Sequence, residues 1–77
     1  MLYVIVRTTE TETSIAMEPT DNIFNAWDMF KALTEIPRAD EQMLARDLVN
    51  RQEVEWTIDN FDDTPNGICR YSLHVCR

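Results

Sequence analysis

The sequence predicts an α+β fold: a small four-stranded, mainly antiparallel sheet with two helices packed on one face, in the order ββααββ. Three observations predict it. Apolar and polar residues alternate with a period of two near both ends of the chain, as they do in half-buried strands. The middle of the chain instead carries apolar residues at helical spacing. The length of 77 residues suits a single compact domain that spans residues 1–77.

The first strand is expected at residues 2–8 and the second at residues 12–18. Apolar side chains fall on both faces of the first strand, with Leu2, Val4 and Val6 on one and Tyr3 and Ile5 on the other. This pattern is typical of a central strand, or of one whose back is covered by a partner. In the second strand, Thr13, Ile15 and Met17 share a face. The link between the two strands lacks Gly, Asn and Pro, so one long bent strand is the alternative to a hairpin.

The first helix is expected to follow Pro19, with Thr20 or Asp21 as its N-cap, and to run to about Glu35. Pro37 cannot continue a helix and ends it. A wide apolar stripe that suits packing on a sheet comprises Ile23, Ala26, Trp27, Met29, Phe30 and Leu33.

A second helix is expected from Ala39 or Asp40 to Arg51. Acidic residues in its first turn and a basic residue in its last turn complement the helix dipole. Its narrower inward face is expected to consist of Leu44, Ala45, Leu48 and Val49.

The last unit is expected to be a hairpin of two strands, at residues 53–61 and 68–76, with a turn in which Gly67 supplies a positive φ. The apolar faces match best with Val54 opposite Val75, Trp56 opposite Leu73 and Ile58 opposite Tyr71. On the outer face, the same register places Asp59 opposite Arg70 and Glu55 opposite His74.

The sequence holds little that suits catalysis. Gly67 is the only glycine, so no glycine-rich phosphate loop is possible. His74 is the only histidine, and neither a Cys–His catalytic pair nor a zinc site finds enough partners around it. If Cys69 and Cys76 lie on one strand, they fall on opposite faces roughly 23 Å apart, which excludes a disulfide between them and leaves an intermolecular bridge open. We therefore expect no enzyme, no catalytic residue, no metal site and no cofactor.

The charge balance narrows the choice of partners. Fourteen acidic residues oppose seven basic ones, which gives a net charge of −7. Direct binding to nucleic acid or to an anionic membrane surface is disfavoured, because both need clustered Lys and Arg. No apolar run is long enough to span a membrane and the start, MLYVIV, is not a signal peptide, so a cytoplasmic location is expected. The natural partner of such a domain is a basic protein surface.

The expected partner-binding residues belong to an acidic run without any basic residue, EVEWTIDNFDD at residues 53–63: Glu53, Glu55, Asp59, Asp62 and Asp63. Alternate residues of a strand lie roughly 6.6 Å apart on one face, so this row of carboxylates offers a basic groove charges spaced somewhat like a nucleic-acid backbone. The alternative is an ordinary solvated edge, where charge prevents aggregation.

The aromatic residues divide between core and surface. Trp27, Phe30, Trp56 and Tyr71 fall at inward positions and are expected in the core. Phe24 and Tyr3 are the candidates for an exposed anchor at an interface.

In size, charge and lack of catalytic residues the chain resembles phage-encoded inhibitors of host defence, such as anti-CRISPR and antirestriction proteins. The resemblance is one of type and not of motif. It implies a phage or mobile-element protein that blocks a basic nucleic-acid-binding groove of a host defence complex. The alternatives are a structural or adaptor module acting as a homodimer through the Tyr3 and Ile5 face, and an antitoxin that neutralises a basic toxin.

Overall fold

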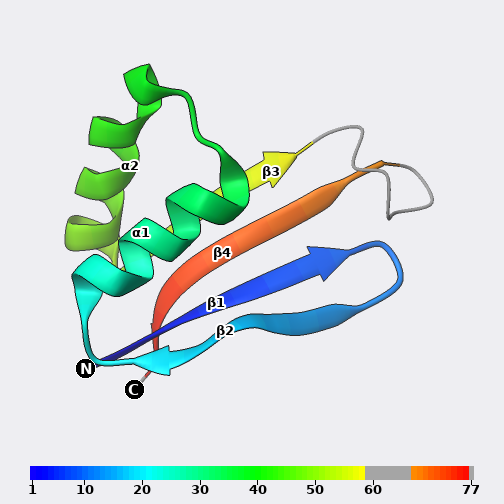
Figure 1. Ribbon diagram of the computed structural model, residues 1–77, viewed down its shortest axis with the longest axis horizontal. Helices are drawn as coiled ribbons and strands as arrows, with labels where there is room; N and C mark the ends of the chain where they lie inside the picture. Colours follow the sequence, from blue (N-terminus) through cyan, green and yellow to red (C-terminus); the bar gives the residue numbers. More distant parts are fainter. Residues whose placement is uncertain (59–66, 77) are drawn as a thin grey trace.

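The computed structural model describes residues 1–58 and 67–76, which fold into one four-stranded antiparallel sheet and two helices (Figure 1). In chain order, the elements are β1 (Leu2–Thr9), β2 (Thr13–Thr20), α1 (Ile23–Thr34), α2 (Arg38–Arg51), β3 (Glu53–Ile58) and β4 (Cys69–Cys76). The expected α+β class and the order ββααββ are confirmed. In the described residues, no helix has the length and apolar character needed to cross a membrane.

The strand order across the sheet is β2-β1-β4-β3, so β1 and β4 are central and β2 and β3 form the two edges. β1 pairs antiparallel with both β2 and β4, and β3 pairs antiparallel with β4. The central position of β1 explains its apolar residues on both faces.

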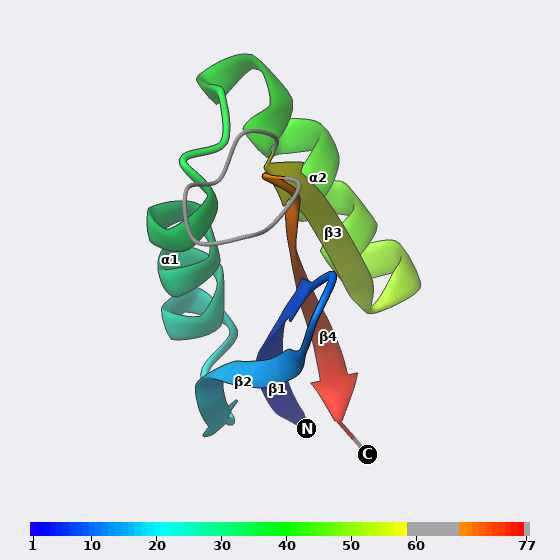
Figure 2. The same cartoon turned by 90° about the vertical axis from the view of Figure 1, so that its right-hand side faces the viewer.

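Both helices pack on the same face of the sheet. The buried core joins side chains from three strands, both helices and the link between the helices: Ile5, Ala26, Phe30, Ile36, Leu44, Leu48, Val54, Cys69, Tyr71 and Leu73. The helix α1 lies across the sheet, whereas α2 runs beside β3 (Figures 1 and 2). Trp27 and Trp56 pack against this core while partly buried, so the expected inward aromatic positions are confirmed.

The N-cap of α1 is Asn22, and the expectation of Thr20 or Asp21 is wrong. The Asn22 Oδ1 accepts hydrogen bonds from the backbone N–H groups of Phe24 and Asn25, at 2.9 and 3.1 Å. These bonds satisfy donors that have no partner within the helix.

The two helices end in the same way, with one residue in the left-handed region. Glu35 (φ 50°) ends α1 and donates its N–H to the Lys31 carbonyl, while Gln52 (φ 59°) ends α2 and donates to the Leu48 carbonyl. The α1 helix therefore stops before Pro37. Of the expected inward residues of α2, Val49 is wrong: it is 68% exposed, whereas Leu44 and Leu48 are buried.

The link between β1 and β2 is a hairpin, and the single bent strand is wrong. The Thr9 N–H donates to the Glu12 carbonyl at 2.9 Å. The Thr9 Oγ1 also accepts from the backbone N–H groups of Thr11 and Glu12. A threonine side chain thus closes this turn without the glycine or asparagine that tight turns ordinarily use.

A bulge in β2 separates two residues that the alternation places together. Val6 lies opposite Ile15, but Ile5 lies opposite Met17, so Ala16 is the extra residue. The expected common face for Ile15 and Met17 is therefore wrong. Met17 packs against the core, and Ile15 is 60% exposed.

The β3–β4 register differs by two residues from the one expected. Trp56 lies opposite Tyr71, and Val54 lies opposite Leu73. A shift of two keeps each side chain on its predicted face, so the apolar face is right and only the pairing is wrong. On the outer face, Glu53 rather than Glu55 lies opposite His74.

Gly67 has a φ of 75°, as expected for the turn residue. The expected pairing of Asp59 lies outside the described residues.

Candidate protein-binding site

Glu53 and Glu55 lie on β3, an edge strand of the sheet, and both side chains are exposed. Val54 between them is buried. Directly across on β4, Glu53 faces His74 and Glu55 faces Ser72. Glu55 therefore has no basic residue directly opposite on β4. The other predicted site residues, Asp59, Asp62 and Asp63, lie outside the described residues.

A hollow of about 380 Å³ lies between α2 and β3. Its described lining consists of Leu44, Asp47 and Arg51 from the helix and Glu53, Val54 and Glu55 from the strand. Asp47 is a site residue that sequence reasoning missed. The signal for it is the single residue, Gln52, that separates the two elements and reverses the chain, so the last turns of α2 lie beside the start of β3.

The hollow follows the edge of the sheet rather than one of its faces. Successive side chains of a strand point to opposite faces. A hollow that touches Glu53, Val54 and Glu55 in succession must therefore run along the strand's outer edge. Leu44 and Val54 are nearly fully buried and form an apolar floor. We call this feature the edge groove.

The edge groove is acidic. Three carboxylates, those of Asp47, Glu53 and Glu55, line it with one guanidinium, that of Arg51. In residues 1–58 and 67–76, no three His, Cys, Asp or Glu side chains come together closely enough to hold a metal ion. The three carboxylates come from both walls of the groove, two from β3 and one from α2.

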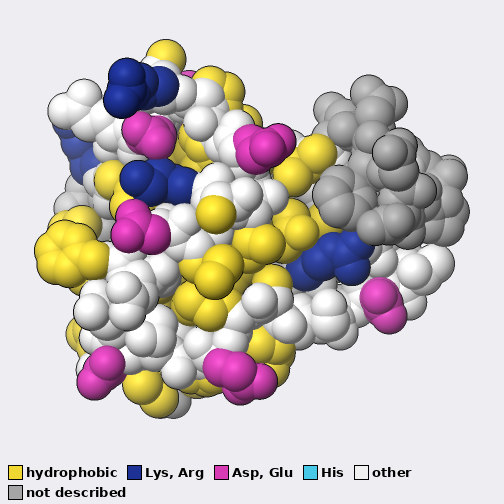
Figure 3. Space-filling view, in the orientation of Figure 1, with side chains coloured by type: hydrophobic (Ala, Val, Ile, Leu, Met, Phe, Trp, Pro, Cys, Tyr) yellow, Lys and Arg dark blue, Asp and Glu magenta, His cyan; other side chains and the backbone are white. Residues whose placement is uncertain are grey.

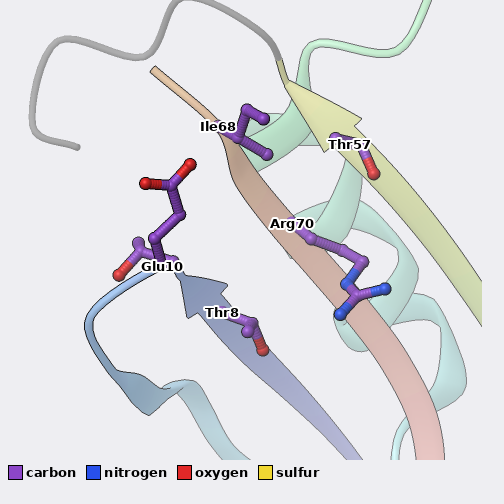
Figure 4. Close-up of a pocket in the computed structure, with 6 residues that line it drawn as sticks. Thr8, Glu10, Thr57, Ile68 and Arg70 are labelled. Atoms are coloured by element: carbon purple, nitrogen blue, oxygen red, sulfur yellow. The ribbon is translucent and has the colours of Figure 1, made fainter. Parts of the chain in front are cut away.

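Arg70 is a basic residue on the outer face of the sheet, the face away from the helices. The register places Arg70 between Thr8 of β1 and Thr57 of β3. Figure 4 shows Arg70 extending from β4 on the side of the sheet away from the helices, over a hollow of about 370 Å³ that Glu10 and Ile68 also line. Arg70 thus pairs with Thr57, two positions beyond Glu55 along β3, and lies opposite neither glutamate.

On the helix-covered face, Tyr71, Arg7 and Cys69 interact. Burial raises the pKa of Tyr71, Cys69 raises it further and the Arg7 guanidinium opposes the shift. Burial lowers the pKa of Arg7, but its hydrogen bonds and charge interactions with Cys69 and Tyr71 outweigh that effect and leave it raised. Cys69 is completely buried and Cys76 is exposed, and both thiols are free.

Of the two candidate aromatic anchors, Phe24 is exposed and Tyr3 is not. Phe24 is 77% exposed beside a small apolar hollow between α1 and α2 that Trp27 and Val49 also line. Hydrophobic side chains are visible where the two helices meet, at the left of Figure 3. Tyr3 packs against the core and Ile5 is completely buried, so the Tyr3 and Ile5 face is not the available surface for a homodimer.

The fold and the edge groove define a small α+β domain with an acidic, solvent-exposed edge strand. The chain matches no protein-family model, no curated protein and no solved structure.

Proposed function

We propose that this protein is a small acidic inhibitor that binds and blocks a basic nucleic-acid-binding groove of a host defence complex. In this proposal it is of the anti-CRISPR or antirestriction type, is encoded by a phage or mobile element and acts in the host cytoplasm. The observation that carries the proposal is the edge groove. There, the predicted Glu53 and Glu55 are joined by Asp47, in a chain with a net charge of −7.

The repeated negative charge along β3 suits a basic groove. Glu53 and Glu55 stand about 6.6 Å apart along the strand, a regular row of negative charge somewhat like that of a nucleic-acid backbone. A groove that binds a polyanion through Lys and Arg therefore meets a comparable row of negative charges. The net charge also steers the two proteins together and makes association sensitive to salt.

Affinity capture with matched variants tests the proposal. Wild-type protein, Glu53→Lys/Glu55→Lys and a control, Glu18→Lys/Asp21→Lys, are used as baits in bacterial lysate and read by mass spectrometry. Glu18 and Asp21 are exposed at the other side of the sheet, and the control changes the net charge by the same amount. We expect wild type and control, but not the Glu53/Glu55 variant, to retain a nuclease or CRISPR-type complex.

The captured complex is then purified and its binding to labelled nucleic acid is measured with increasing amounts of each variant. Competition by wild type and control alone supports groove blocking. Undiminished nucleic-acid binding, or equal competition by the Glu53/Glu55 variant, contradicts it.

One observation favours the alternative of an adaptor that forms a homodimer. Phe24 and Val49 are largely exposed on the two walls of the apolar hollow between α1 and α2. Light scattering in low and high salt decides: a salt-resistant dimer that Phe24→Asp dissociates favours the adaptor. The antitoxin alternative shares the charge argument, and capture of a small basic toxin favours it.

A further inference from the structure

We propose that the edge groove holds an extended basic segment of the partner, which adds to β3 as a further antiparallel or parallel strand. This inference rests on the proposed function, because it names how the partner of the acidic surface is held. It goes beyond charge, since it assigns the main-chain groups of β3 a direct part in binding.

The backbone of β3 has an open side. Among the described strands, β3 pairs with β4 alone and forms the end of the sheet. An edge strand presents a row of N–H and C=O groups that another extended chain can pair with. The outward groups of β3 face the edge groove, because the groove is lined by three consecutive residues of the strand.

The edge groove has the shape that a strand requires. One wall is β3 and the other is the last turns of α2, which contribute Asp47 and Arg51. Leu44 and Val54 are nearly fully buried on the helix side of the groove, where they lie next to the residues of an added strand that alternate with its Lys and Arg. The volume of about 380 Å³ leaves room for several side chains and not only for an ion.

The charge pattern specifies a basic segment. Alternate residues of an added strand repeat at about 6.6 Å, the same spacing as Glu53 and Glu55. Lys or Arg at every second position of the added strand therefore meets Glu53 and Glu55 in succession, while the residues between them face the helix wall, where Asp47 lies. Carboxylate–guanidinium pairs are among the stronger hydrogen-bonded contacts.

The opposite edge of the sheet is less suited to the same role. β2 contains a bulge at Ala16, and Pro19 near its end has no backbone N–H. Both features interrupt the regular row of donors and acceptors that strand addition needs. The structure thus leaves β3 as the more regular open edge.

Synthetic peptides test the inference on the whole protein. The probe is an acetylated, amidated octapeptide in which Arg and Thr alternate. Two further peptides of the same charge carry N-methyl groups either on every Arg amide or on every Thr amide. In an added strand only one of these two sets of amides faces β3, and a one-residue slip would turn the Arg side chains to the other face.

We expect the unmethylated peptide and one methylated peptide to bind, and the other methylated peptide to bind at least about tenfold more weakly. Glu53→Lys/Glu55→Lys should weaken binding by a similar factor, and Glu18→Lys/Asp21→Lys should not. Amide hydrogen exchange of β3 should slow when the unmethylated peptide is bound.

Two results overturn the inference. Equal binding of both methylated peptides, with loss only on charge reversal, shows a charged surface without strand addition. Absence of any peptide binding to wild type at low salt also rejects an extended segment as the occupant. The capture experiment tests the proposed function separately. This protein can still compete with nucleic acid for the folded basic groove of a partner even when it binds no extended peptide.

Discussion

Phe24 and Phe30 lie on the same helix and have opposite surroundings: Phe24 is 77% exposed, and Phe30 is completely buried. Phe30 also stacks with Trp27, with ring centroids 6.0 Å apart. The Phe30 carbonyl accepts a hydrogen bond from the Thr34 hydroxyl, which is itself buried. One helix therefore joins the core through Phe30 and presents an unpartnered aromatic ring through Phe24.

Phe30→Ala should destabilise the domain by about 3–5 kcal/mol, because it leaves a cavity in the centre of the core. Total stabilities of small domains are about 5–15 kcal/mol, so this variant should be unfolded in part at 37 °C. Phe24→Ala is the matched control and should change the free energy of unfolding by less than about 0.5 kcal/mol. Urea unfolding followed by circular dichroism measures both, and equal losses would contradict the described packing of α1.

Asn22→Ala should cost about 1 kcal/mol, because it removes the acceptor of two backbone N–H groups at the start of α1. Asn22→Asp keeps an acceptor at the same position and should be nearly neutral or slightly stabilising. Asp21→Ala provides the comparison, since Asp21 is not the cap residue. Chemical unfolding of the four proteins ranks them, and a larger loss for Asp21→Ala than for Asn22→Ala would return the cap to Asp21.

Alternation predicted the faces of β3 and β4 but not their register, for a physical reason. A slip of two residues leaves every apolar side chain on the core face, so hydrophobic burial hardly distinguishes the registers. Only individual cross-strand pairs differ, such as Trp56 with Tyr71 instead of Trp56 with Leu73. Those pairs differ by fractions of a kcal/mol, which sequence inspection does not resolve.

The errors at Asn22 and Ala16 have related causes. Thr20, Asp21 and Asn22 are three consecutive residues that all suit an N-cap, so composition alone does not choose among them. A bulge at Ala16 and a second register shift between Tyr3 and Ile5 change the alternation of β2 at single residues, which the spacing of apolar residues does not reveal. Glu53 and Glu55 could be found from their alternation, whereas Asp47 joins them only through the chain reversal at Gln52.

The two cysteines should react at very different rates with a thiol reagent such as dithionitrobenzoate. Cys76 is exposed and should react in the folded protein, whereas Cys69 is completely buried and should react only when the chain unfolds. Absorbance should therefore report one thiol without denaturant and two in concentrated urea. Cys76→Ser isolates the slow thiol, and rapid labelling of that variant in buffer would show that Cys69 is accessible.

Alkaline pH should destabilise the fold through Tyr71. Its pKa is raised above the usual value of 10 by burial and by Cys69, against the opposing effect of Arg7. The folded state thus favours the protonated phenol, and its contribution to stability is complete below about pH 10. That contribution is lost as the pH rises from about 10 through the raised pKa of the folded state.

Urea midpoints of wild type and Tyr71→Phe between about pH 8 and pH 11 measure this effect. Wild type should lose stability more steeply above about pH 10 than the variant, because phenylalanine has no proton to lose. Parallel curves for the two proteins would exclude Tyr71 as the source of the pH dependence.

The pairing of β1 with β4 in the centre of the sheet sets the timing of folding during synthesis. Leu2 lies opposite Cys76 and Thr9 opposite Cys69, so β1 pairs with a strand, β4, that is synthesised after both helices and β3. A nascent chain can form the β1–β2 hairpin and both helices before β4 is available to pair with the other edge of β1. Closing this long loop is costly in entropy and should delay the final step beyond the rates of the local elements. Until β4 leaves the ribosome, β1 is an apolar sheet edge, and this is the interval in which the chain is most exposed to aggregation.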